Sequence, residues 1–420
     1  MKQRYDVIVV GAGPAGSTCA RFAAARGASV LVLEKDRDVG MPVRCGEAVS
    51  NRSLEKIVDI DPRWIAATIK RFRLISPSGQ IVEPDLGGYG YVLERRIFDY
   101  DLARLAVEAG AEVHTKSYVS GLLPSEGGPH TDASSAESPR PIARRDGGSI
   151  ASRGEGAAEW PGVSLTWKGE ARTVYGRIIV GADGVESRVG KWAGIDTTTH
   201  MRDMESCAQM TLANVDLEDD ACEFYFGNDT APMGYLWVFP KGNGMANVGV
   251  GISGMASKRK AAIRYLQEFV ERRFPGAGVL TTVAGGVPCA TTVETLVKGN
   301  IVLVGDAAHM VNPMSGGGIT SGMIGGKLAG EAIALALEKN DLSLLNEYPK
   351  KWRKEVGAKH ETYHKMKAAV YKFPDETLDD IAANVLKLRE DKRTIWGVFR
   401  TALRHQPSLV WEMVKTFGLG

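Results

Sequence analysis

The sequence predicts a protein of the α/β class, in which a three-layer domain is interrupted by a β-sheet domain and followed by a helical C-terminal region. The first observation is a strand, a glycine-rich turn, a helix and a second strand within residues 5–33. The second is a strand-rich, aromatic stretch at 203–252, which predicts an antiparallel sheet. The third is a return of the strand–turn–helix pattern near residue 300, ending in a long helix over about 320–338. A chain of 420 residues is too long for one compact core, so two or three domains are expected.

Composition and charge are those of an ordinary globular protein. Hydrophobic residues make up 44% of the chain and charged residues 24%, and the net charge of +2 comes with no basic block. Nucleic acid is therefore not expected as a partner. The first residues run directly into the apolar segment 7–10, which is too short for a secretory signal. No apolar run reaches the roughly 18 residues of a membrane-spanning helix, so a cytoplasmic location is expected.

The cysteines favour the same compartment. There are five of them, an odd number, and they are scattered without metal-ligand spacing. We expect reduced thiols of an intracellular protein and no bound metal. They are Cys19, Cys45, Cys207, Cys222 and Cys289.

The glycine-rich turn at residues 11–16 reads Gly-Ala-Gly-Pro-Ala-Gly. Gly11 permits the tight turn, Gly13 lets the backbone approach a pyrophosphate, and Gly16 allows close contact between helix and strand. The N-terminus of the following helix offers free N–H groups to phosphates. Glu34 ends the second strand, where a carboxylate can accept hydrogen bonds from a ribose diol. Such a turn is weak alone, but with strand, helix and acid in place it predicts a Rossmann-like dinucleotide site.

Two more glycine-rich segments follow apolar strands. Residues 181–187 read Gly-Ala-Asp-Gly-Val-Glu-Ser, and an ordinary Asp-Gly turn explains them equally well. Residues 305–309 read Gly-Asp-Ala-Ala-His, and a triple glycine at 316–318 opens the long helix. Asp306 stands at a strand end, where it can bind a ribityl hydroxyl. The triple glycine lets the backbone approach an isoalloxazine ring.

In this order and spacing, the three segments resemble the glutathione-reductase-like FAD superfamily that includes aromatic hydroxylases. The resemblance implies FAD in a Rossmann-like domain, with Asp306 on the ribityl chain. Segment 124–161, rich in Ser, Gly, Pro and Arg, is expected to be a flexible insertion. The expected domains are an FAD-binding domain of residues 1–70, 94–195 and 283–340, a substrate domain of residues 71–93 and 196–282, and a C-terminal helical region of residues 341–420.

Two further segments narrow the resemblance to one family. Residues 42–47 read Pro-Val-Arg-Cys-Gly-Glu, and residues 235–240 read Tyr-Leu-Trp-Val-Phe-Pro. They are similar to the P-x-R-C-x-E and Y-x-W-x-F-P motifs of the geranylgeranyl reductase family. The likeness to archaeal digeranylgeranylglycerophospholipid reductases covers the chain apart from 124–161. It implies that reduced FAD saturates isolated double bonds of geranylgeranyl chains by hydride transfer.

Position by position, the resemblance implies contacts to the cofactor and to the substrate. Besides Gly11, Gly13 and Gly16, the residues implied around FAD are Ala15, Glu34, Cys45, Gly46, Ala48, Arg95, Val119, Asp306, Gly318 and Ile319. Tyr235 and Trp237 are implied in the wall of a prenyl pocket, and strand alternation adds Phe239 to the same face. The alternative is that this face is simply the core of its domain.

Cys45 is the candidate catalytic residue. An unactivated alkene has no carbonyl to polarise it, so hydride transfer needs a dry and tightly positioned site. Cys45 is flanked by Arg44 and Glu47 and is expected near the reactive ring, where it positions the substrate or relays the proton that follows the hydride. The alternative is a small buried hydrophobic side chain.

Two other functions stay open at this point. One is a flavin-dependent monooxygenase or halogenase acting on an aromatic compound, and the other is a non-catalytic prenyl-binding carrier of the same fold. For the reductase, the substrate is a prenylated lipid or isoprenoid: an archaeal-type ether lipid precursor, geranylgeranyl diphosphate or a quinone side chain. No second glycine fingerprint with its own βαβ unit is present, so a dedicated NADPH domain is not expected. The choice of electron donor stays open between NAD(P)H, ferredoxin and a quinol, and a redox donor protein is a candidate partner.

Polyprenyl lipids live in bilayers, which raises the question of peripheral contact with the cytoplasmic face of a membrane. Segment 395–403 is amphipathic, with apolar residues beside Arg393 and Arg400. Interfacial helices have this pattern, and so do ordinary packing helices. Packing is the favoured interpretation.

Overall fold

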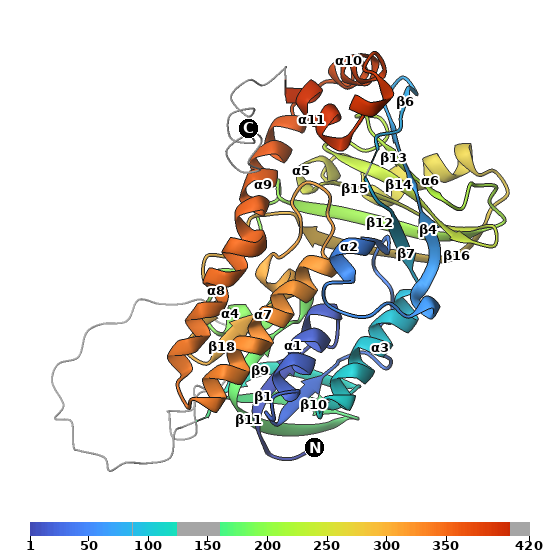
Figure 1. Cartoon of the computed structure of the whole chain (residues 1–420). Coiled ribbons are helices and arrows are strands. Elements are labelled where there is room, and N and C mark those ends of the chain that lie inside the picture. The colour runs from blue at the N-terminus through green and yellow to red at the C-terminus, as the bar shows by residue number, and fades with distance from the viewer. Residues whose placement is uncertain (86, 124–159, 404–420) are drawn as a thin grey trace, which may run out of the picture.

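A computed structural model describes residues 1–85, 87–123 and 160–403 (Figure 1). The expected insertion at 124–161 therefore lies almost entirely outside the described residues, as does the end of the expected C-terminal region.

The first domain is built on an eight-stranded sheet. Along its main path the strands are β17 (Val297–Lys298), β18 (Ile301–Leu303), β11 (Glu170–Gly181), β1 (Arg4–Val10), β2 (Val30–Leu33) and β8 (Glu112–His114), with β10 (Gly162–Trp167) and β9 (Ser117–Leu123) attached beside β11. β1 pairs in parallel with β2 and β11, and β11 pairs in parallel with β18. The loops that follow β1, β11 and β18 therefore meet at one edge of the sheet.

Helices cover this sheet and complete the predicted three layers. The helices are α1 (Pro14–Ala24), α3 (Arg95–Glu108), α4 (Arg188–Trp192) and α7 (Ile319–Glu338). α1 packs against both α3 and α7 (Figure 1). Two glycines of α7 make the close approach to α1 feasible, because a Cβ would lie 2.3 Å from the Ala15 carbonyl oxygen at Gly326 and 2.6 Å from the Cys19 carbonyl oxygen at Gly330. The predicted long helix over 320–338 is confirmed.

The second domain is built on a seven-stranded sheet. In spatial order its strands are β16 (Gly278–Pro288), β12 (Met204–Ala213), β15 (Met245–Ser253), β14 (Gly234–Gly242), β13 (Ala221–Tyr225), β5 (Arg71–Ile75) and β6 (Ile81–Val82). Every neighbouring pair is antiparallel except β13 and β5, which are parallel. The expectation of a purely antiparallel sheet is thus wrong at this edge, because β5 enters from the first part of the chain rather than through a hairpin.

Side-chain alternation divides this sheet into two faces. α6 (Ala262–Arg273), preceded by the short α5 (Gly254–Ser257), covers one face, where Leu266 and Phe269 pack on Leu236, Val238 and Val250. The opposite face carries the residues between these, as expected for a period of two.

A small three-stranded sheet lies against that opposite face. It consists of β3 (Ala48–Ser50), β7 (Gly90–Leu93) and β4 (Ile65–Ile69), with α2 (Asn51–Leu54) directly after β3. Its Ile69 and Val92 pack with Trp237 and Phe239 of β14.

Two of the expected domain boundaries divide strands that are paired in the structure. The expected boundary after residue 70 separates β7 from both of its partners, and the boundary after residue 282 falls inside β16, which stays paired with β12 through Pro288. The division into domains stays a prediction, and the sheets favour a boundary after Pro288.

The described part of the C-terminal region is helical, as predicted. It contains α8 (Glu347–Trp352), a π-helical turn (Arg353–Gly357), α9 (Ala358–Val370), α10 (Asp375–Leu386) and α11 (Ile395–Leu403). Figure 1 shows α8 and α9 running from the first domain to the second, with α10 and α11 near β6. Buried Tyr348 fastens α8 to the first domain by donating a hydrogen bond to the Leu303 carbonyl oxygen at 2.8 Å. Across the described ranges, no helix is both long enough and apolar enough to span a membrane.

Candidate functional site

The three glycine-rich segments predicted to act together are in contact. Gly11 has φ +105°, and a Cβ there would lie 2.3 Å from the Ala182 carbonyl oxygen. A Cβ on Gly305 would lie 2.8 Å from the Ala15 side chain. The first segment is thus pressed between the second and the third, and a side chain at either glycine would force them apart.

The two other glycines of the first segment have different roles. A Cβ on Gly16 would lie 2.1 Å from the Gly11 carbonyl oxygen, so this glycine allows the helix to pack on the turn. Gly13 caps α1 with no side-chain hydrogen bond, has an ordinary φ of −67°, and has no heavy atom within 4 Å of its Cβ position. The space beside Gly13 at the N-terminus of α1 is therefore open, which fits a pyrophosphate.

Glu34 is held at the end of β2 in the position expected of a ribose-binding acid. One carboxylate oxygen accepts a hydrogen bond from the Ala12 N–H at 2.8 Å, and the other accepts one from the Asp36 N–H at 3.0 Å. The carboxylate is thereby fixed beside the glycine-rich turn and remains half-buried.

Asp306, Gly318 and Ile319 come together at the start of α7. Gly318 caps the helix, Ile319 is its first residue, and Asp306 Oδ1 lies 3.2 Å from the Cβ position of Gly318. Burial raises the pKa of the Asp306 carboxyl, while the charge of Arg95 lowers it. Arg95 is itself clamped by two 2.6 Å hydrogen bonds to Asp99. These residues fit the ribityl side of a flavin site.

The segment at 181–187 serves as a structural turn. Asp183 accepts a hydrogen bond from the Val189 N–H at 3.0 Å, and Ser187, with φ +44°, donates one to the Ala307 carbonyl oxygen at 2.8 Å. The second glycine-rich segment is in this way fastened to the third.

Sequence reasoning missed a buried ion pair that joins the two hallmark segments. Glu47 is 3% exposed, and its carboxylate accepts hydrogen bonds from Lys241 Nζ at 2.5 Å and from the Asn247 amide. The other carboxylate oxygen accepts one from the Arg95 N–H at 2.9 Å. An acid in one hallmark segment and a lysine directly after the other was the available signal.

Gly46 brings the first hallmark segment onto the second. A Cβ there would lie 2.8 Å from the Phe239 ring and 3.1 Å from Trp237 Nε1. Because the rings occupy that space, only glycine allows the loop at 42–47 to lie against them.

The aromatic residues of β14 share one face, as alternation predicts. The ring centroids of Tyr235 and Trp237 are 5.9 Å apart, and those of Trp237 and Phe239 are 6.2 Å apart. Tyr235 donates a hydrogen bond to the Ser315 carbonyl oxygen, so the aromatic row ends at the triple-glycine loop. Trp237 and Phe239 are also largely buried, at 9% and 6% exposure, so the core interpretation and the substrate interpretation describe the same surface.

The same face continues across two more strands. Register places Gly249 and Gly251 of β15 directly between β14 and β12. We call this surface the slot face, and it comprises Tyr235, Trp237, Phe239, Gly249, Gly251, Glu205, Cys207 and Gln209.

Cys45 lies half-buried in the loop beside the slot face. Its sulfur accepts a hydrogen bond from the Glu47 N–H at 3.3 Å. Burial raises the pKa of the thiol more than the charge of Arg95 lowers it, so the thiol keeps its proton at neutral pH. A proton relay and a small buried side chain are both compatible with this state.

Ala48 and Val119, the two remaining residues predicted to contact FAD, lie outside the glycine-rich segments and the Cys45 loop. Ala48 begins β3 and packs beside the cluster that contains Trp237. Val119 lies in β9, and its side chain is buried in the main core of the first domain. A contact between Val119 and a cofactor would have to use the backbone.

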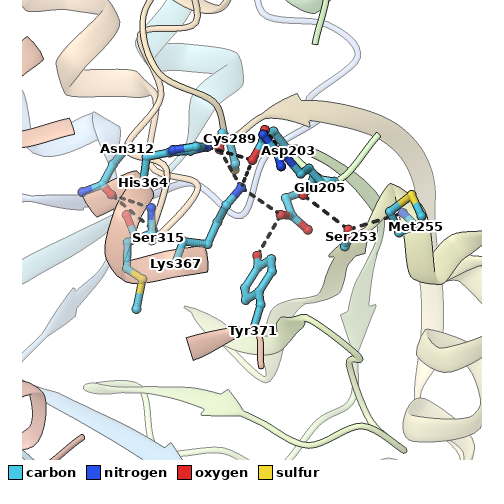
Figure 2. Close-up of polar contacts among 12 residues, drawn as sticks. Asp203, Glu205, Ser253, Met255, Cys289, Asn312, Ser315, His364, Lys367 and Tyr371 are labelled. Atoms are coloured by element: carbon cyan, nitrogen blue, oxygen red, sulfur yellow. Dashed lines mark hydrogen bonds and ion pairs between the residues drawn. The ribbon is translucent and has the colours of Figure 1, made fainter. Parts of the chain in front are cut away.

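A buried charged cluster at the start of β12 was also missed. Lys367 Nζ lies 3.3 Å from Asp203 and 3.7 Å from Glu205, and Tyr371 donates a 2.7 Å hydrogen bond to Glu205 (Figure 2). The signal in the sequence was Glu205 at the start of a strand whose apolar neighbours alternate with it.

Fold and site together fit a flavin-dependent oxidoreductase. The start of α1 is open beside Gly13, the Glu34 carboxylate is fixed beside the glycine-rich turn, and a buried aromatic face meets the triple-glycine loop.

Comparisons with known proteins specify the family. The family model of the geranylgeranyl reductase catalytic domain matches residues 203–287, and that of an NAD(P)-binding Rossmann-like domain matches residues 9–74. A digeranylgeranylglycerophospholipid reductase of Methanocella arvoryzae is 39% identical over 99% of this chain and 99% of its own length. A solved structure from Thermoplasma acidophilum, described as geranylgeranyl bacteriochlorophyll reductase-like, has a TM-score of 0.84 and 31% identity, covering 99% of this chain and all of its own (100%). The chain belongs to the geranylgeranyl reductase family.

Membership of this family confirms the predicted class, an FAD-dependent oxidoreductase acting on carbon–carbon double bonds. A solved flavin-dependent brominase has a TM-score of 0.67 at 18% identity, covering 99% of this chain and 93% of its own. That similarity shows a shared fold alone, so it does not favour the halogenase alternative.

Proposed function

We propose that this protein saturates double bonds of geranylgeranyl chains on a glycerophospholipid precursor. The observation that carries the proposal is the union of the two hallmark segments. The Glu47–Lys241 pair and Gly46 hold the Cys45 loop against Trp237 and Phe239. The curated relative with the matching length is named for reduction of a digeranylgeranylglycerophospholipid, and the aromatic face suits such a chain.

FAD, when bound and reduced, would supply the hydride. The residues of this chain would hold it through the N-terminus of α1 beside Gly13, through Glu34 at the adenosine ribose and through Asp306 at the ribityl chain. The aromatic rings of the slot face would exclude water and fix the alkene. Each Å² of apolar surface that the chain buries there contributes about 25 cal/mol to binding.

Cys45 enters the proposal as a residue beside the reacting alkene. Its protonated thiol and its place next to Gly46 suit a group that positions the substrate or passes on a proton.

The test of the activity is an anaerobic turnover. The purified protein is reduced chemically in the absence of oxygen and incubated with a digeranylgeranylglycerophospholipid. The mass of the product is then measured by mass spectrometry. We expect a gain of two hydrogen atoms for each double bond reduced. Turnover that requires oxygen and yields a hydroxylated product would contradict the proposal.

Peripheral membrane contact and a redox donor protein belong to the same proposal. The substrate must be drawn from a bilayer, yet Val398 and Ala402 of α11 pack with Val385 of α10 and its neighbours. This packing supports an ordinary structural role for α11. Liposome flotation of the full chain and of a truncation ending at Asp391 should therefore give the same bound fraction.

A further inference from the structure

The slot face has a polar end that the proposed function leaves unexplained. Glu205, Cys207 and Gln209 alternate on β12 and point to the same side as the aromatic row. Cys207 stands across Gly251 from Tyr235, and Gln209 stands across Gly249 from Trp237. The glycine strand between them brings the polar row and the aromatic row onto one continuous surface.

Several buried polar atoms on this surface have no partner. Glu205 Oε2, Gln209 Oε1 and Trp237 Nε1 are all buried and make no hydrogen bond within the described residues. A buried polar group left without a hydrogen-bond partner destabilises a folded protein. Their concentration on one face indicates that this face is built to meet a bound molecule.

The other oxygen of Glu205 is held by the C-terminal region. Glu205 Oε1 accepts a hydrogen bond from Tyr371 at 2.7 Å and lies 3.7 Å from Lys367 Nζ (Figure 2). Lys367 is 1% exposed, and its ammonium group also donates to the Cys289 carbonyl oxygen at 2.6 Å. Glu205 Oε2 is the oxygen that this cluster leaves unbonded.

Charge balance in the cluster favours a protonated Glu205. Asp203 is closer to the Lys367 ammonium, at 3.3 Å, and also contacts His364 at 2.8 Å. Burial would raise the pKa of Asp203, but the His364 hydrogen bond and the Lys367 charge outweigh it and lower that pKa. For Glu205 burial dominates and raises the pKa to about 7, although Tyr371 and Lys367 oppose it. One ammonium group thus supports one carboxylate, and the second acid keeps its proton near neutrality.

The cluster lies next to the place where the triple-glycine loop meets the slot face. A Cβ on Gly316 would be 4.0 Å from Cys289 Sγ and 3.7 Å from the Tyr235 hydroxyl. The backbone of Cys289 is held by Lys367, so the same residue links the charged cluster to the triple-glycine loop.

We propose that Glu205 is the acid that delivers the proton to the alkene, an inference that rests on the proposed reductase function. One alkene carbon receives the hydride with its two electrons, and the other receives the proton of the Glu205 carboxyl group. The π bond is lost and a saturated C–C bond remains. Glu205 is left as a carboxylate beside Tyr371 and Lys367, and a proton from solvent restores it.

The first experiment compares Glu205→Gln with a matched control. Glu223→Gln also replaces a buried glutamate that accepts a tyrosine hydrogen bond, from Tyr225 at 2.6 Å, but it stands on β13. The variants are loaded with FAD, reduced chemically without oxygen, and mixed with a digeranylgeranylglycerophospholipid while flavin reoxidation is followed. We expect Glu205→Gln to bind FAD normally and to slow reoxidation by about 100-fold or more, the range of general acid catalysis. Glu223→Gln should react within about twofold of wild type.

The second experiment measures the titration itself. The titratable groups around Glu205 come from four parts of the chain. They are Asp203 before β12, Cys207 on β12, Tyr235 on β14, Cys289 after β16, His364 and Lys367 on α9, and Tyr371 directly after α9. Wild-type reoxidation should fall above about pH 7. Tyr371→Phe removes a hydrogen bond that lowers the pKa of Glu205, so the fall should move to higher pH. Infrared pH-difference spectra of the oxidised holoenzyme should contain a carboxylic acid band that is absent from Glu205→Gln.

The outcomes separate the two proposals. If wild type fails to reduce the alkene, the proposed function fails. If wild type reduces it, and Glu205→Gln retains the rate and pH profile of wild type, Glu205 is not the proton donor. Should Glu205→Gln not fold, an unchanged pH profile in Tyr371→Phe overturns the proposal instead.

Discussion

Cys45 and Glu205 are both candidates for the transfer of the proton that follows the hydride. Their surroundings indicate different roles for the two side chains. Cys45 lies in a loop packed on the aromatic rings through Gly46, whereas Glu205 lies near the start of β12 in a charged cluster. A thiol with a raised pKa is a poor nucleophile but an acceptable packing or hydrogen-bonding group. The geometry therefore favours positioning by Cys45 and protonation by Glu205.

Substitutions of Cys45 test this division of labour. We expect Cys45→Ala to keep FAD and to lower the rate of alkene reduction by roughly tenfold, since a misplaced substrate loses the benefit of orientation. Cys45→Ser keeps a proton donor of similar size, and it should recover most of the lost rate only if the thiol relays a proton. Single-turnover reoxidation of the reduced flavin measures both variants. Full activity in Cys45→Ala would remove any role for this residue in the reaction.

At the scale of elements, the sequence predicted what is local and missed what is distant. The glycine turn, α1 and the acid at Glu34 lie within one βαβ unit, so their spacing alone places them. The Glu47–Lys241 pair joins residues 194 positions apart, and the Tyr371–Glu205 hydrogen bond spans 166. No periodicity reports such partners. The parallel pairing of β5 with β13 was missed for the same reason.

The alternation of side chains was informative only in part. It placed Tyr235, Trp237 and Phe239 on one face, as the structure has them. It could not show that β15 would present Gly249 and Gly251 between that row and Glu205, because this depends on the register of three strands. Register is set by hairpins and packing rather than by the pattern of one strand.

Gly13 and Gly16 of the first glycine-rich turn have different surroundings, so their substitution by alanine should have different effects. Gly13→Ala places a methyl group in open space at an ordinary φ and loses only the N-cap preference for glycine, so the unfolding free energy of the FAD-free protein should stay within about 1 kcal/mol of wild type. The methyl group would occupy the approach of the pyrophosphate, and FAD affinity should fall at least about tenfold, equivalent to about 1.4 kcal/mol. Flavin fluorescence titration and urea unfolding measure the two effects.

Gly16→Ala is the control for that variant, since its methyl group would lie 2.1 Å from the Gly11 carbonyl oxygen. Overpacking of this kind costs about 1–3 kcal/mol. We expect Gly16→Ala to lower the stability of the FAD-free protein more than Gly13→Ala does. Equal stability losses in the two variants would contradict the assignment of Gly13 to the cofactor.

At the scale of the whole molecule, the C-terminal helices connect both domains. α8 is fastened to β18 through Tyr348, and Lys367 and Tyr371 reach β12 of the second domain from the end of α9. The charged cluster is therefore a contact on which the relative position of the two domains depends. Its ionisation should appear in the stability of the entire chain.

The free energy of unfolding of the chain should depend on pH through Glu205. Folding raises the pKa of Glu205 from 4.5 to about 7. Between these values the folded state binds more protons than the unfolded state, so this group's contribution is present below about pH 4.5 and is lost as pH rises through 7. From pH 5 to pH 8 the loss amounts to about 2.5 kcal/mol. Glu205→Gln cannot ionise, so its free energy of unfolding should fall less over this range than that of wild type.

Comparing wild type with Glu205→Gln separates the effect of Glu205 from that of groups whose contribution to stability changes with pH in the opposite direction. Burial lowers the pKa of His360 to about 4 and lowers that of His309, so these residues make the folded state more stable as pH rises toward 6.5. They contribute equally to wild type and to Glu205→Gln, and their effects cancel in the difference. Urea unfolding at pH 5 and pH 8 supplies the four values required. A difference that does not change with pH would mean that Glu205 is ionised throughout, and the stored proton on which the reaction is proposed to depend would not exist.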